Sequence, residues 1–189
     1  LYDIGIYCIN AARYLFRDEP TEVTALAGRG HDRRFQKVEE SAGAILRFPH
    51  DRLATLTCSF GATDAAMYEI VGTKGRVRVE PAYEYLGSLK ASITVNGKTR
   101  VRTFRPGDQF APQLIYFASC VQDNRQPEPN GLEGLLDVQI IEALHRSARQ
   151  GRSVPLRLST KQVRPDVRLQ MHRPPVVKPK QVRATSPTL

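Results

Sequence analysis

The sequence has no run of roughly 18 apolar residues, the length needed to cross a membrane, so no transmembrane helix is predicted. Its three cysteines, Cys8, Cys58 and Cys120, are widely spaced and form neither a CxxC pair nor a Cys/His cluster. This spacing argues against a zinc site or a disulfide framework and favours reduced, buried thiols. Nothing at its start resembles a signal peptide. We therefore expect no metal and a cytoplasmic location.

A glycine-rich nucleotide-binding motif is also missing. Gly28-Arg29-Gly30 is not followed by the third glycine that opens a helix in a dinucleotide fingerprint. The Gly72–Gly75 stretch (GTKG) is typical of a hairpin turn rather than a phosphate loop. We therefore expect no cofactor-binding residues within this chain.

The net charge of +9 is concentrated at one end of the chain. From Gly151 onward there are nine Lys or Arg residues and one acidic residue, Asp166, so the first 150 residues are nearly neutral. This segment holds six prolines and, apart from His172, no aromatic ring on which a base could stack. The composition argues against nucleic-acid binding and predicts a basic, Pro-rich extended tail over residues 159–189. Packing on a neighbouring domain or subunit is expected, and an anchor for an acidic surface is the alternative.

Hydrophobic patterning predicts an α+β domain over residues 1–158. Residues 3–16 have the pattern of a helix with Asp3 as a candidate N-cap, and residues 21–26 alternate as a strand does. Further strands are expected at residues 41–48, 53–60, 65–71, 76–80, 88–95 and 98–104. Asn96-Gly97 is a strong hairpin signal. Consecutive hairpins predict one open, mostly antiparallel sheet with a face that helices must cover.

Two later helices are expected to provide this cover. Residues 108–123 carry one apolar stripe, formed by Phe110, Leu114, Phe117, Ala118 and Val121. Residues 132–149 form the second helix, with Asn130 as its N-cap and Gly151 as its C-terminal stop, and a strand over 153–158 follows. Alternation leaves apolar side chains such as Ile45 on the other face of the sheet, which predicts a homo-oligomer that covers it.

Asp3 and Tyr7 form the candidate catalytic constellation. They are four residues apart, so on a helix they share one face, which Asn10 and Tyr14 continue. A tyrosine hydroxyl can act as a general acid or base when a nearby cation favours its charged form. No lysine lies in this segment, and the nearest cation, Arg13, is six residues away. The spacing alone favours the structural interpretation, in which Asp3 caps the helix and Tyr7 packs with its hydroxyl at the boundary.

Several short motifs recur here in the order seen in one protein family. They are Asp3–Tyr7 (DIGIY), Asn10, Arg13–Leu15 (RYL), Glu19-Pro20, Gly72–Gly75 (GTKG), Gln109-Phe110, Gln113-Leu114, Glu133-Gly134, Asp137-Val138 and Ser147–Gly151 (SARQG). In this order they resemble the C-terminal domain of the glucose–fructose oxidoreductase, inositol dehydrogenase and rhizopine-catabolism (Gfo/Idh/MocA) family. The resemblance covers residues 1–158 and is strongest for the glucose–fructose oxidoreductase branch.

The resemblance implies half of an active site. Family members join a Rossmann domain that binds NAD or NADP to an α+β domain that binds a sugar-like substrate. Their D-x-x-x-H/Y motif maps onto Asp3 and Tyr7, and their catalytic lysine belongs to the Rossmann domain, which is absent from this chain. Asn10, Arg13 and Gln109 match positions near the substrate, although helix packing explains them equally well. The implied activity is hydride transfer on a sugar or polyol. A non-catalytic sugar-binding or scaffolding member of the family is the alternative.

Overall fold

The computed structural model describes residues 1–159 and 164–175. The chain divides into two compact units, which we describe separately. The first unit combines residues 1–64 with residues 124–169, and the second combines residues 65–123 with the segment that begins at residue 170. Each unit combines at least one helix with an open antiparallel sheet. The prediction of an α+β class with open antiparallel strands is therefore confirmed.

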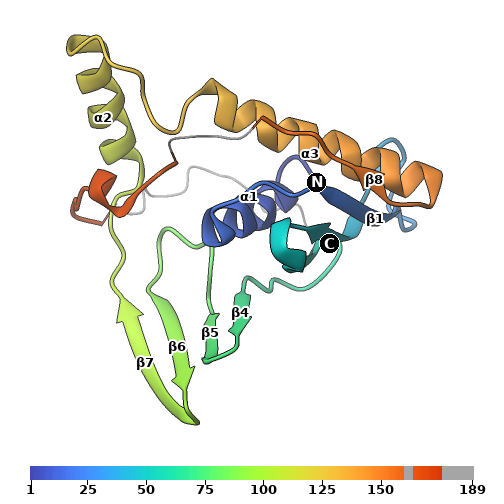
Figure 1. Cartoon of the computed structure of the whole chain (residues 1–189), viewed down its shortest axis with the longest axis horizontal. Helices are drawn as coiled ribbons and strands as arrows, with labels where there is room; N and C mark the ends of the chain where they lie inside the picture. Colours follow the sequence, from blue (N-terminus) through green and yellow to red (C-terminus); the bar gives the residue numbers. More distant parts are fainter. Residues whose placement is uncertain (160–163, 176–189) are drawn as a thin grey trace. The chain divides into compact units, whose positions relative to one another are not determined.

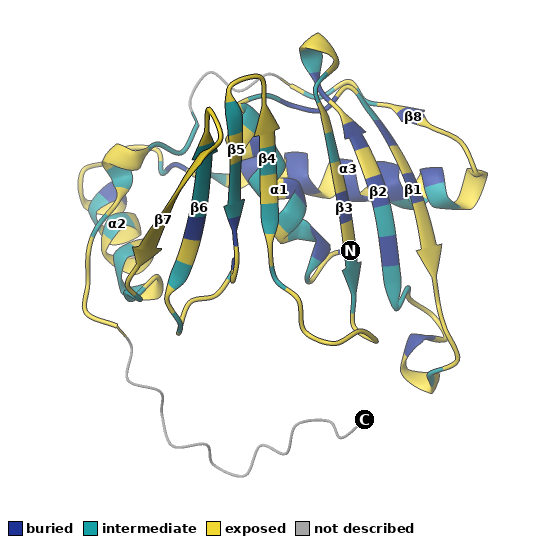
Figure 2. Ribbon diagram, turned by 90° about the horizontal axis from the view of Figure 1, so that it is seen from below, coloured by how far each residue is buried: buried dark blue, intermediate teal, exposed yellow. Residues whose placement is uncertain are grey.

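The first unit is a four-stranded sheet with two helices on one face (Figures 1 and 2). Its elements are α1 (Gly5–Phe16), β1 (Glu22–Gly28), β2 (Ser41–Arg47), β3 (Leu53–Ser59), α3 (Gly131–Gln150) and β8 (Val154–Pro155), with 3-10 turns at Arg33–Phe35, Pro49–Asp51 and Val167–Leu169. The strand order is β3-β2-β1-β8, and every neighbouring pair is antiparallel. Because strand side chains alternate between faces, β2 directs Ala44 and Leu46 toward the helices and leaves Ile45 exposed on the opposite face.

The core of this unit lies between the sheet and the two helices. Helix α3 contributes Ile140, Ile141 and Leu144, which are completely buried, and α1 contributes Ile9. Both expected ends of α3 are confirmed: the Asn130 side chain accepts hydrogen bonds from the backbone N–H groups of Leu132 and Glu133, and Gly151 ends the helix with a φ of 63°. The core thus fixes α1 and α3 against one face of the same sheet.

The second unit contains β4 (Tyr68–Gly72), β5 (Gly75–Val79), β6 (Leu89–Val95), β7 (Lys98–Phe104) and α2 (Phe110–Gln122). The four strands form a simple antiparallel meander in chain order. The hairpin predicted at Asn96-Gly97 is confirmed, because both residues adopt positive φ, 50° and 75°, as the tight turn between β6 and β7 requires.

Two expectations about the sheet need correction. The strands form two four-stranded sheets instead of one, with β3 and β4 in different sheets. Tight turns specify which consecutive strands pair, but the longer link between β3 and β4 carries no such signal. The α2 stripe is also not buried, since Leu114 is 72% exposed and Phe110, Phe117 and Val121 are exposed as well. Periodicity identifies the apolar face of a helix but not the surface against which it packs.

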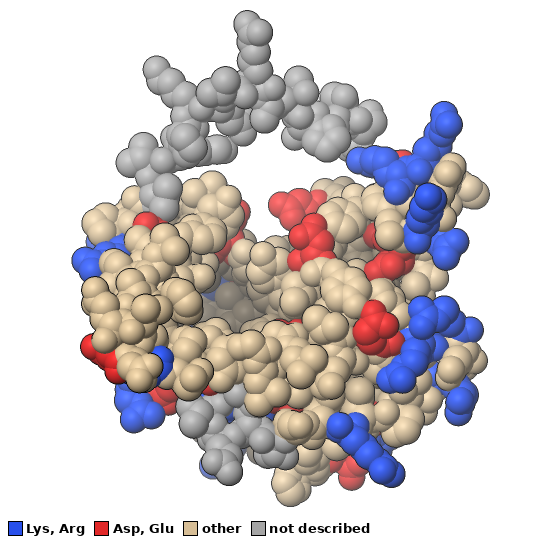
Figure 3. Space-filling model, turned by 90° about the horizontal axis from the view of Figure 1, so that it is seen from above, with Lys and Arg blue, Asp and Glu red and all other residues tan. Residues whose placement is uncertain are grey.

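Part of the predicted tail is described. Within residues 159–189, residues 160–163 and 176–189 lie outside the described residues. On the face drawn in Figure 3, Lys and Arg side chains of the described residues form separate groups among acidic and uncharged ones. Arg164, from the tail, reaches into the first unit and is described with the site below. None of the helices in the described part of the chain is long and apolar enough to cross a membrane.

Candidate functional site

Helix α1 has one exposed face and one buried face. Tyr7, Asn10 and Tyr14 follow each other at three- or four-residue spacing and are all exposed. On the other side of the helix, Ile9 and Arg13 are excluded from solvent. Because the buried side is fixed in the first unit, the helix presents the row of polar side chains in a defined orientation.

Asp3 does not cap α1, so that interpretation of its position was wrong. The N-cap is Ile4, whose backbone is helical and whose side chain can accept no hydrogen bond. Asp3 lies in the turn before the helix and is exposed, and among the described residues its carboxylate has no hydrogen-bond or ion-pair partner. The carboxylate is therefore available to an external group, one turn before Tyr7.

Two tyrosines, Tyr2 and Tyr7, lie close to Asp3 in the sequence. The Tyr2 hydroxyl donates a hydrogen bond to Glu142 of α3. This hydrogen bond, burial and the neighbouring carboxylates all raise the pKa of Tyr2 above the usual value for a tyrosine, which keeps it protonated. Tyr7 is 56% exposed on the outer face of α1. Tyr2 is nearly as exposed, at 48%, so the raised pKa of Tyr2 and its hydrogen bond to Glu142, rather than exposure, set Tyr2 apart.

Arg13 is the centre of a buried ion network, although the sequence marked it as a candidate substrate ligand. Its Nε donates to Glu19 Oε2 (2.6 Å), and its two terminal nitrogens contact Asp137 Oδ1 (2.5 Å) and Glu133 Oε1 (2.9 Å). The side chain is only 1% exposed. These three carboxylates account for Arg13 without any ligand, and they join α1 to α3 and to the segment that follows α1.

The protonation of this network follows from burial and from its pairs. Burial by itself disfavours a charged guanidinium, but the hydrogen bond to Glu19 and the charges of Asp137 and Glu133 outweigh it and raise the pKa of Arg13. Burial raises the pKa of the Asp137 carboxyl, although Arg13 and Asn10 favour its charged form. Arg13 therefore stays charged, and burial makes the Asp137 carboxyl take up a proton more readily than an exposed aspartate does.

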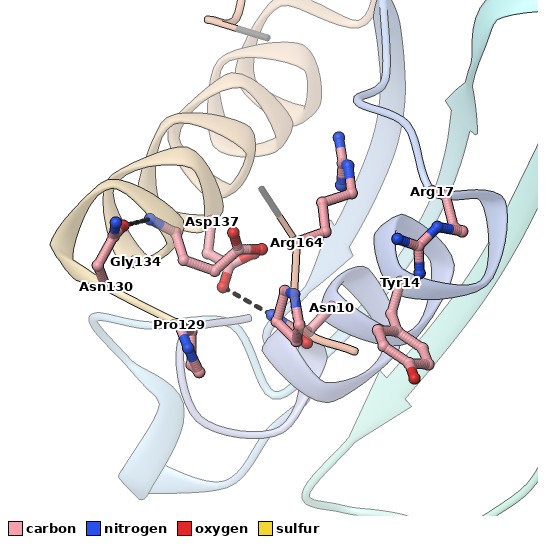
Figure 4. A pocket seen from close by; sticks show the side chains of 10 residues that line it. Asn10, Tyr14, Arg17, Pro129, Asn130, Gly134, Asp137 and Arg164 are labelled. Atoms are coloured by element: carbon pink, nitrogen blue, oxygen red, sulfur yellow. Dashed lines mark hydrogen bonds between the residues drawn. The ribbon is translucent and has the colours of Figure 1, made fainter. Parts of the chain in front are cut away.

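A pocket of about 290 Å³ lies beside the network (Figure 4). Helix α1 contributes Asn10 and Tyr14 to its lining, and the start of α3 contributes Asn130 and Asp137. Asn10 Nδ2 donates to Asp137 Oδ2 at 3.0 Å, so Asn10 connects the exposed face of α1 to the buried charges. The pocket offers hydrogen-bond donors and acceptors together, as a polyol requires.

The remaining predicted site residue, Gln109, lies in the second unit just before α2. Its Nε2 donates to the backbone oxygen of Glu84, with a nitrogen–oxygen distance of 3.5 Å. The structure thus brings Asp3, Tyr7, Asn10 and Arg13 together on or beside one helix, and it gives Gln109 a backbone contact within its own unit. Within the described residues, no group of three or more His, Cys, Asp and Glu side chains is arranged to hold a metal ion.

Arg164 also belongs to the site, although its position in the sequence does not mark it as a site residue. Arg164 NH2 donates to Glu19 Oε1 at 2.7 Å, and its side chain is 10% exposed. Nothing in the sequence distinguishes Arg164 from the other basic residues of the tail, because its partner lies 145 positions earlier. Only the folded chain identifies it as part of the network.

The chain is similar in sequence to one family model and to several known proteins. Residues 1–78 match the family model for the GFO/IDH/MocA C-terminal domain. D-xylose 1-dehydrogenase [NADP(+)] of Haloarcula marismortui is 30% identical over 155 residues, which is 82% of this chain and 43% of the relative. Trans-1,2-dihydrobenzene-1,2-diol dehydrogenase of Xenopus tropicalis is 34% identical over 79% of this chain and 46% of its own length.

One solved structure is similar to the chain in both fold and sequence. The crystal structure of aldose-aldose oxidoreductase from Caulobacter crescentus, complexed with glycerol, superposes with a TM-score of 0.75 at 36% identity. The match covers 82% of this chain and 46% of that protein. This chain therefore spans about half the length of the relatives that it matches.

Proposed function

The chain belongs to the Gfo/Idh/MocA family, and from this we propose that it is the C-terminal substrate domain of an NAD(P)-dependent oxidoreductase acting on a sugar or related polyol. The relatives support this proposal, because one is named as an NADP-dependent D-xylose dehydrogenase and another as an aldose-aldose oxidoreductase complexed with glycerol. The observation that carries it is the pair formed by Asp3, with its unengaged carboxylate, and the exposed Tyr7 on a helix fixed by buried charges.

Each side chain has a defined part in the proposed reaction. Tyr7 accepts the proton of the substrate hydroxyl during oxidation and returns it during reduction. Asp3 accepts a hydrogen bond from a neighbouring hydroxyl of the substrate and so orients the reacting carbon. Asn10 extends the polar surface toward the pocket. Arg13, which is buried and paired with three carboxylates, holds the helix and does not contact the substrate.

The nicotinamide cofactor supplies or accepts the hydride. The described residues include no glycine-rich phosphate loop, so we propose that a domain outside these 189 residues binds most of the cofactor. The same domain would supply the lysine whose charge favours ionisation of the Tyr7 hydroxyl. The 189 residues alone are then inactive. The apolar side chains on the outer sheet face, among them Leu26, Ile45 and Leu53, would be covered by a second copy of the protein.

The test is an assay of the longer protein that joins this chain to its cofactor-binding domain. With D-xylose or D-glucose and either NAD⁺ or NADP⁺, we expect the absorbance of the reduced nicotinamide to increase. The isolated chain should give no increase with the same mixtures. Sugar binding by the longer protein without reduction of either nucleotide would contradict the proposal and favour the scaffolding member of the family.

A further inference from the structure

The buried network contains a second arginine beside Arg13. Arg13 contacts Glu19, Glu133 and Asp137, all of which are buried residues. A buried carboxylate is costly unless a cation is paired with it, so a second cation at this position stabilises the folded state. Arg164 is that cation, and it shares the carboxylate of Glu19 with Arg13.

Arg164 comes from a segment that the sheet does not hold. β8 ends at Pro155, and Arg164 follows nine residues later. Its guanidinium lies against Glu19, three residues after the end of α1, and both Arg164 and Pro165 line the pocket beside Asn10 (Figure 4). The segment therefore contacts both the buried ion network and the polar pocket, the two features that α1 helps to form.

The effect of this contact reaches Tyr7 through the helix itself. Tyr7 and Arg13 lie on the same α1, and at about 1.5 Å of rise per residue they are separated by roughly 9 Å along its axis. A helix whose buried arginine is clamped between fixed carboxylates cannot rotate without breaking those ion pairs. Any residue that completes the clamp therefore helps to set the direction in which Tyr7 points.

We propose that Arg164 is a positioning residue for α1. It adds a second cation to the buried network from the C-terminal segment and thereby holds Tyr7 in its working orientation. The proposal rests on the proposed oxidoreductase function, but its structural part can be measured separately. Arg168, four residues further on, is the matched control, because its side chain is 87% exposed and pairs only locally with Asp166.

The experiment compares Arg164→Met, Arg164→Lys and Arg168→Met in the longer protein. Backbone amide hydrogen exchange reports on α1, with the amides of β2 as the internal reference. We expect Arg164→Met to accelerate exchange in α1 while β2 keeps the wild-type rate. The value of kcat should fall on the order of 10-fold to 100-fold, as for a misplaced catalytic group. KM for the cofactor should stay constant. Arg164→Lys should recover part of kcat, and Arg168→Met should match the wild type in both measurements.

Three results would overturn the positioning role. One is wild-type exchange and kcat in Arg164→Met, and another is faster exchange throughout α1, β2 and α3, which would indicate a general loss of stability. The third is a fall in kcat of equal size in Arg168→Met. If the wild-type protein has no oxidoreductase activity, the proposed function fails, whereas selective exchange in α1 would still establish the clamp. The two failures are therefore distinguishable.

Discussion

Arg13 and Tyr7 lie six residues apart on α1 and meet opposite environments. Arg13 is enclosed by Glu19, Glu133 and Asp137, whereas Tyr7 is more than half exposed. Both residues were candidate site residues in the sequence, but in the fold one is buried and the other is exposed. The buried arginine holds the helix, and the exposed tyrosine is presented by it.

Replacing Arg13 by methionine should destabilise the chain by about 3–5 kcal/mol, because the change leaves three buried carboxylates without their shared cation. Urea unfolding of wild type and variant measures the difference. Arg47→Met is the control: Arg47 pairs with Glu22 and Asp51 but is about half exposed, so its loss should cost no more than about 1 kcal/mol. Equal costs for the two substitutions would contradict the account of the network.

Ser147 connects the end of α3 to β1 and is completely buried. Its hydroxyl accepts a hydrogen bond from the backbone N–H of Ala25 (3.0 Å) and donates one to the backbone oxygen of Arg152 (2.7 Å). Ser147→Ala leaves both backbone groups without this partner and should lower the free energy of unfolding by about 1–3 kcal/mol. The exposed Ser153 serves as comparison, and Ser153→Ala should change that free energy by less than about 0.5 kcal/mol.

Asp137 gives the network a defined dependence on pH. Burial raises its pKa in the folded state, so the folded chain binds a proton more tightly than the unfolded chain. The contribution of Asp137 to stability therefore falls as pH rises from its unfolded pKa, about 3.9, through its higher folded pKa. In urea unfolding, the free energy of unfolding of the wild type should fall relative to that of Asp137→Asn as pH rises through this range. A relative gain of wild type with rising pH would show that the pKa is lowered instead.

The local elements were predictable because their signals are local. Asn96-Gly97 demands a tight turn, Asn130 caps α3 and Gly151 ends it, and each acts on residues a few positions away. The Asp3–Tyr7 spacing likewise placed both groups on or beside one helix. Their roles in catalysis remain predictions, as do the substrate contacts of Asn10 and Gln109.

The features that the sequence did not predict depend on distant partners. The environment of Arg13 is set by Glu133 and Asp137, more than a hundred residues away, and Arg164 has a partner equally remote. Neither hydrophobic period nor turn chemistry carries such information. The same limit explains why β3 and β4 were assigned to one sheet, and why an apolar stripe on α2 was expected to be covered.

The most direct test of the account replaces Tyr7 by phenylalanine in the longer protein that contains the cofactor-binding domain. Loss of the hydroxyl should lower kcat on the order of 100-fold or more, because the substrate proton loses its acceptor, while the urea midpoint stays at the wild-type value. Tyr85→Phe, at a similarly exposed tyrosine of the second unit, should keep wild-type kcat. Wild-type kcat in Tyr7→Phe would contradict the claim that this chain supplies the proton-transfer group.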